Sequence, residues 1–245
     1  MRRFAQAFVD VDAFAPGLPD HLTLALASAV QRYNIGKGCA AAVLFATDGE
    51  EPSITDMQWG LVPRWSKEPF TPYTTVTARL SKAPSSRLFT SAWEHRHCIV
   101  PMTGYYKWDR ERKPPWPMFV QRQDGRALLA AGLWERWQDE AGQALESFTV
   151  LTDANRFIPA PLSPDGPVFV SAEVAMYWLS GAINTPAALK ARSRTDALEA
   201  HYVSKAVRDL KHDDYTLLEP ISPGEANAEG AVAWDGDGLD EDEDG

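Results

Sequence analysis

Apolar residues in this chain fall mostly into short runs that are separated by proline, glycine and polar residues. Short apolar runs bounded by turn residues are typical of β-strands, whereas an amphipathic helix repeats its apolar positions every three to four residues. Because consecutive runs adjoin one another without long helical segments between them, they predict a mainly antiparallel sheet. The predicted strands are Ala40–Ala46, Ile54–Gly60, Cys98–Pro101, Tyr105–Trp108, Met118–Gln121, Ala127–Trp134, Ser147–Thr152 and Asp214–Pro220.

Four segments show helical signals instead. His21–Tyr33 carries apolar residues about one turn apart, and Arg87–His95 is a short segment rich in large apolar side chains. Ser171–Leu179 begins with a serine suited to cap a helix. Thr185 and a following proline open an alanine-rich stretch that extends to about Lys205. We therefore predict an α+β fold: a curled, mainly antiparallel sheet or barrel with a few flanking helices.

Charge is distributed unevenly along the 245 residues. The formal net charge is −10, but residues 222–245 alone contain nine acidic residues and no lysine or arginine, so residues 1–221 carry a net charge of −1. We predict one domain over residues 1–221 and an acidic, disordered tail over residues 222–245. A nearly neutral domain can still present a local basic groove, so the charge balance does not exclude DNA as a partner.

Cysteine content and hydropathy point to the cytoplasm. Cys39 and Cys98 are too few for a disulfide framework, and both lie in apolar runs, so we expect reduced, buried thiols. Asp10 and Asp12 interrupt the apolar start of the chain, which does not fit a signal peptide. No stretch approaches the roughly 20 apolar residues of a membrane span. We expect a cytoplasmic protein, located at the bacterial nucleoid when it is bound to DNA.

Several short motifs follow one another in a fixed order. They are Trp59-Gly60-Leu61-Val62-Pro63 with Trp65, Thr77-Ala78-Arg79, Arg96-His97-Cys98-Ile99-Val100-Pro101, Gly104-Tyr105-Tyr106-Lys107-Trp108, Ala131-Gly132-Leu133-Trp134-Glu135 and Thr152-Asp153-Ala154-Asn155. In order, spacing and content they resemble the SOS response-associated peptidase family. The family's patterns are WGL[IV]P-x-W, NAR-x-E, RCL[IV]P-x-x-GFYEW, AGLWE and T-x-x-AN. The resemblance extends over about residues 1–227.

The resemblance implies a specific chemistry. In that family a cysteine follows the initiator methionine, and its amine and thiol condense with the aldehyde of an abasic site in single-stranded DNA to form a thiazolidine cross-link. The same cysteine is thought to give members an autoproteolytic activity. An asparagine, a glutamate and a histidine from three of the motifs position the sugar and transfer protons.

This chain departs from the family at every one of these positions. No cysteine follows Met1, and the other replacements remove an amide, reverse a charge and remove an imidazole. The family positions are occupied by Arg2, Thr77, Lys107 and Ser163; in addition, Asp165 stands where the family has a DNA-facing arginine. The packing motifs persist while the chemical positions change, which indicates a scaffold retained without the original reaction. A sequence that is losing its function altogether is the alternative, since fold does not imply function.

Other residues are candidates for DNA contact. Aromatic side chains can stack on unpaired bases, and arginine can bind phosphate through charge-assisted hydrogen bonds. The alternatives are a core tryptophan and a surface arginine held in a salt bridge. The complete set of predicted DNA-binding residues is Arg2, Arg3, Trp59, Pro63, Arg64, Trp65, Lys67, Thr77 and Arg79.

Three functions remain open on these grounds. The first is non-covalent binding of single-stranded or abasic-site DNA in the DNA-damage (SOS) response, without cross-linking or autoproteolysis. The second is a pseudoenzyme that acts as a protein-interaction module. The third is abasic-site processing through Lys107 or the N-terminal amine, since a desolvated lysine can form a Schiff base. We expect no cofactor and no metal, because His95, His97 and Cys98 do not converge without distant ligands.

Overall fold

A computed structural model describes residues 1–14, 16–47, 50–193, 197–222 and 224. Five strands close into a barrel, because β10 hydrogen-bonds both to β4 and, across the closure, to β9. Two short strands, β5 (Thr77–Arg79) and β11 (Asp165–Pro167), pair with β10. The barrel strands are β3 (Ala40–Phe45), β4 (Ser53–Trp59), β6 (His97–Met102), β9 (Leu128–Gln138) and β10 (Ala144–Ala154).

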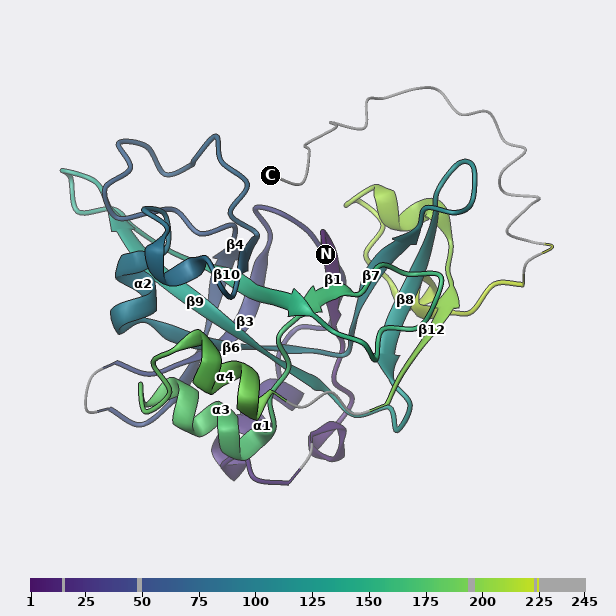
Figure 1. Ribbon diagram of the computed structural model, residues 1–245, viewed down its shortest axis with the longest axis horizontal. Helices are drawn as coiled ribbons and strands as arrows, with labels where there is room; N and C mark the ends of the chain where they lie inside the picture. The colour runs from purple at the N-terminus through teal and green to yellow at the C-terminus, as the bar shows by residue number, and fades with distance from the viewer. Residues whose placement is uncertain (15, 48–49, 194–196, 223, 225–245) are drawn as a thin grey trace.

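A second, five-stranded antiparallel sheet lies beside the barrel (Figure 1), in the order β12-β8-β7-β1-β2. The buried Gln6 side chain joins the two sheets: its Nε2 donates to the carbonyl oxygens of Ala42 and Pro101, each at 2.8 Å. Its Oε1 accepts from the Ala42 backbone N–H at 2.9 Å, so the buried amide makes three hydrogen bonds between the two sheets. The strands are β1 (Arg3–Gln6), β2 (Arg32–Ile35), β7 (Gly104–Asp109), β8 (Trp116–Arg122) and β12 (Leu198–Tyr202).

Four helices flank the barrel (Figure 1): α1 (Asp20–Ala27), α2 (Thr90–His95), α3 (Ala172–Leu179) and α4 (Pro186–Arg192). Ser171 and Thr185 cap α3 and α4 by accepting backbone N–H groups, as the sequence predicts. Short 3-10 helices lie at Val11–Ala13, Ala83–Ser85, Lys205–Arg208 and Tyr215–Leu218. None of the helices in the described part of the chain combines the length and the apolar character needed to span a membrane.

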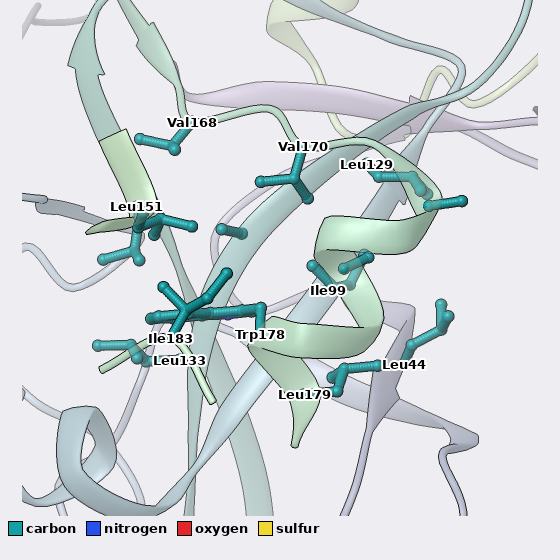
Figure 2. Close-up of a cluster of buried hydrophobic side chains, with 14 of the residues drawn as sticks. Leu44, Ile99, Leu129, Leu133, Leu151, Val168, Val170, Trp178, Leu179 and Ile183 are labelled. Carbon is teal, nitrogen blue, oxygen red and sulfur yellow. The ribbon is translucent and has the colours of Figure 1, made fainter. Parts of the chain in front are cut away.

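The largest core cluster fills the space between α3 and the barrel (Figure 2). Trp178 lies in it with its ring stacked on the imidazole of His97, at 3.6 Å between centroids. Its Nε1 donates to the carbonyl oxygens of Cys98 and Gly132. The apolar residues around it in Figure 2 include Leu44, Ile99, Leu129, Leu133, Leu151, Val168, Val170, Leu179 and Ile183.

The predicted α+β class and mainly antiparallel sheet are confirmed, but three predicted elements are wrong in part. The first helix ends at Ala27, and β2 follows it. The helix that begins at Thr185 ends at Arg192, and β12 replaces its second half. The last predicted strand is a 3-10 helix over Tyr215–Leu218. In the first two cases pairing with β1 and β8 outweighs local helix propensity. The predicted disordered tail lies outside the described residues, apart from Ser222 and Gly224.

Candidate functional site

Three strands bring the replaced family positions together. β1 pairs with β7 so that Arg3 lies opposite Tyr106, and continuing this register places Arg2 opposite Lys107. β11 pairs with the end of β10, where Asp165 lies opposite Ala154. The start of the chain, Lys107 and Asp165 therefore meet at one place, although they are far apart in the sequence. We call Met1, Arg79, Lys107, Ser163 and Asp165 the β7–β11 cluster.

Lys107 is at the centre of the β7–β11 cluster and only 8% exposed. Its Nζ donates to the Ser163 hydroxyl at 3.0 Å and to the backbone carbonyl oxygen of Asp165. Burial lowers the pKa of Lys107, while the Asp165 carboxylate acts in the opposite direction. Lysine has three N–H donors, so two are engaged within the described part of the chain and one remains for a ligand.

Arg79 and Asp165 form an ion pair at the exposed side of the β7–β11 cluster. The Arg79 Nη1 lies 3.4 Å from the Asp165 Oδ1, and both side chains are nearly half exposed, at 48% and 43%. Thr77 lies two residues before Arg79 on β5, and the alternation of strand residues places both on the same face, opposite the buried Ala78. Thr77 and Arg79 therefore lie on one face of β5, and the ion pair with Asp165 connects Arg79 to the β7–β11 cluster.

The α-amino group of Met1 lies among these charges. Its pKa is lowered to about 6, first by burial and then by the positive charge of Lys107, whereas Asp165 raises it. Arg2 and Arg110 lower it further. An amine with this pKa is mostly unprotonated at neutral pH, and an unprotonated amine is a nucleophile. The sequence pattern alone does not reveal this environment, because burial and the approach of Lys107 arise only when β1 pairs with β7.

Trp65 is the best exposed of the predicted aromatic contacts. It lies on the long connection between β4 and β5, is 46% exposed, and packs against Arg87, whose guanidinium carbon is 4.8 Å from the ring centroid. Phe70 and Tyr73 on the same connection are also exposed. The three rings were not recognised together in the sequence, since only Trp65 belongs to a motif. An exposed aromatic group beside arginine suits stacking on unpaired bases.

Two of the predicted DNA contacts do not fit the structure. Trp59 is fully buried: its Nε1 donates to the Val76 carbonyl oxygen at 2.8 Å and its ring packs edge-on against Phe4. Pro63 is buried as well. Both residues precede Trp65 and pack in the core, so the Trp59–Pro63 motif is mainly a packing motif. The physical reason is that β4 ends at Trp59 and directs this side chain into the core.

The predicted basic residues differ in their environments. Arg2 and Lys67 are exposed, whereas Arg3 is half-buried and donates to the Arg208 carbonyl oxygen. Arg64 lies 3.5 Å from the carboxylate of Glu135, which also pairs with Arg96 at 3.1 Å. These contacts leave Arg2 and Lys67 as the more accessible cations for phosphate.

His97 has a structural role. Both of its ring nitrogens lie 2.8 Å from backbone carbonyl oxygens, those of Trp93 and Trp178. Cys98 is buried, which raises the pKa of its thiol, and Cys39 is half-buried. Over the described residues, no cluster of three or more histidine, cysteine or acidic side chains has an arrangement that would hold a metal ion.

Comparison with known proteins establishes the family to which this chain belongs. Residues 7–210 match the SOS response associated peptidase (SRAP) family. The chain belongs to that family. It is 26% identical over 196 residues to the abasic site processing protein YedK of Escherichia coli, covering 78% of this chain and 86% of YedK. It is also 26% identical over 176 residues to the abasic site processing protein YoqW of Bacillus subtilis, covering 70% and 79% of the two chains.

A crystal structure of a protein from Bacteroides thetaiotaomicron has the same fold. It superimposes with a TM-score of 0.74 at 20% identity, over 91% of this chain and all of the other. The family match begins at residue 7, so Met1 and Arg2 lie outside it.

Proposed function

We propose that this protein binds abasic sites in single-stranded DNA without forming the thiazolidine cross-link, in the response to DNA damage. The observation that carries the proposal is the contact network among the replaced positions. Lys107, Ser163 and Asp165 each depart from the family pattern, yet the Lys107 ammonium donates to both of the others. These hydrogen bonds satisfy the buried ammonium within the fold, and its third N–H can donate to a ligand.

The side chains of the β7–β11 cluster favour binding of DNA over cross-linking to it. A thiazolidine requires a thiol next to the amine, and position 2 is arginine. The family's proton-transfer residues are replaced by Lys107, Ser163 and Thr77, and hydroxyl groups at ordinary pKa are poor general bases near neutral pH. Hydroxyl and ammonium donors instead suit the oxygen atoms of an abasic sugar and its phosphates. Exposed Arg2 and Arg79 lie beside these donors.

Binding to single-stranded DNA should weaken when either edge of the site is altered. Arg79→Ala is expected to reduce affinity about three- to tenfold, because one phosphate contact is lost, and to flatten the dependence on salt by about one contact. Trp65→Ala is expected to reduce affinity by about five- to hundredfold, with little change in salt dependence, because stacking is worth about 1–3 kcal/mol per base. Fluorescence anisotropy over a salt series measures both.

The control is Tyr177→Ala, which removes another exposed aromatic ring, from helix α3. It should leave affinity unchanged. No salt-dependent binding by the wild-type protein, to abasic or intact single strands, would contradict the proposal and favour the protein-interaction alternative.

A second candidate function is supported by the low pKa of the Met1 amine. An unprotonated amine can add to the ring-opened aldehyde of an abasic site and lose water to form an imine, which borohydride reduces to a stable secondary amine. This adduct needs no thiol. The geometry favours Met1 over Lys107, because the Lys107 ammonium already donates two hydrogen bonds.

Borohydride trapping with abasic single-stranded DNA tests this candidate. Since the pKa of the Met1 amine is about 6, the neutral form should be about tenfold scarcer at pH 5 than at pH 7.5, and trapping should fall accordingly. Peptide mapping by mass spectrometry should place the adduct on Met1. An adduct on Lys107 that Lys107→Met abolishes would assign the reaction to the lysine, and no trapped adduct at any pH would remove this candidate.

A further inference from the structure

Asp165 contacts the two cationic side chains of the β7–β11 cluster, Arg79 and Lys107, in different ways. Its carboxylate pairs with Arg79 from β5, whereas its backbone carbonyl oxygen accepts the Lys107 ammonium from β7. The backbone of Asp165 is also held by the pairing of β11 with the end of β10. Main-chain contacts therefore fix the position of the residue, and they do not depend on where its carboxylate points.

The carboxylate occupies the place that an anionic ligand of Arg79 would take. A guanidinium presents a planar set of N–H donors that matches carboxylate and phosphate oxygens equally well. Two anions cannot share the same donors without repulsion, so the Asp165 carboxylate and a phosphodiester compete for Arg79. The pairing distance of 3.4 Å and the near half-exposure of both side chains mean that water and ligands can reach the pair.

Such an exposed pair is easily displaced. Ion pairs between solvent-exposed side chains contribute at most about 1 kcal/mol, so a ligand that makes several other contacts can break this one. The same small energy still lowers affinity several-fold, because tenfold in affinity corresponds to about 1.4 kcal/mol. The ion pair is therefore strong enough to reduce binding and weak enough to open.

We propose that the Asp165 carboxylate is an internal competitor for the DNA phosphate at Arg79, which lowers the protein's affinity for single-stranded DNA in general. This proposal rests on the proposed function, since it concerns how the same site binds DNA. A strand gains Arg79 as a phosphate contact only after the carboxylate rotates away, so binding depends more heavily on contacts elsewhere in the site. Asp165 is thus a residue that limits affinity rather than one that binds DNA.

Asp165→Asn tests this directly, because it keeps the size of the side chain and the backbone contact with Lys107 while removing the negative charge. Affinity for single-stranded DNA of undamaged sequence should rise about two- to fivefold at low salt. The slope of log affinity against log salt should change by less than about 0.7, the value of one phosphate contact on a single strand, because Arg79 binds the same phosphate in both proteins. In an Arg79→Ala background the same substitution should produce less than half of this gain.

The matched control is Asp124→Asn, which makes the same change in net charge at a carboxylate of similar exposure (45%), 2.6 Å from Arg122 in the turn between β8 and β9. Equal gains from Asp165→Asn and Asp124→Asn would show a general charge effect and overturn the competition. An equal gain with and without Arg79 would overturn it as well. If neither the wild type nor Asp165→Asn binds DNA, the proposed function itself fails, and the two failures are thereby distinguished.

Discussion

Replacement of Trp178 by alanine should lower the free energy of unfolding by about 3–5 kcal/mol, the range observed when a buried tryptophan is truncated. Trp178 is completely buried. It stacks on His97, meets Trp93 edge-on with 5.5 Å between ring centroids, and donates from Nε1 to two carbonyl oxygens. The truncation leaves a cavity at the position of Trp178 between α3 and the barrel (Figure 2), and it removes the ring on which the His97 imidazole stacks.

Chemical denaturation followed by circular dichroism measures this loss. Trp65→Ala is the matched control: it removes the same side chain from an exposed loop and should change the free energy of unfolding by no more than about 0.5 kcal/mol. Equal effects of the two substitutions would contradict the assignment of Trp178 to the core. Because α3 packs on β6 and β9, the Trp178→Ala protein is also expected to bind DNA less well wherever it is partly unfolded.

Lys107→Glu should reduce affinity for single-stranded abasic DNA by about 30-fold or more. The substitution restores the acidic residue type of the family at this position, but it places a second carboxylate beside Asp165. It also removes the donor that holds Ser163 and the Asp165 carbonyl oxygen. Truncating one partner of a buried, hydrogen-bonded charge contact costs about 2–5 kcal/mol, and each 1.4 kcal/mol is tenfold in affinity.

Lys107→Met separates the effect of charge from the effect of packing, since methionine keeps most of the apolar stem without a charge. Its affinity should fall between those of the wild type and Lys107→Glu. Thermal unfolding of all three proteins shows whether a loss of binding reflects a loss of folded protein. Unchanged affinity in a folded Lys107→Glu protein would exclude Lys107 from the site.

The proposed role of the β7–β11 cluster in DNA binding does not depend on restoring the family's chemistry. A protein with glutamate at position 107 would still have arginine at position 2 and serine at position 163, and therefore no thiol and no imidazole there. The family relationship is shown by the match over residues 7–210 and by relatives called abasic site processing proteins. What distinguishes this chain is a buried Lys107 ammonium that donates to Ser163 and to the backbone of Asp165, whose exposed carboxylate pairs with Arg79.

The sequence by itself determined the family, the α+β class and the positions of the seven main strand runs. These follow from local information: short apolar runs bounded by turn residues, helix caps at Ser171 and Thr185, and motifs with fixed spacing. The sequence also identified Lys107, Ser163 and Asp165 as departures from the family pattern. For each, residue type alone was enough, because a change from acid to base or from imidazole to hydroxyl is visible without coordinates.

Only the tertiary structure decided how the departures act together. The strands β2 and β12 lie in segments of helical composition, and they form because β1 and β8 offer unpaired edges. Trp59 and Trp65 belong to one motif, yet burial assigns the first to the core and leaves the second at the surface. The meeting of Lys107 with Ser163 and Asp165 arises from strands distant in sequence. Such contacts depend on which edges pair and which faces are buried, and these are properties of the whole chain.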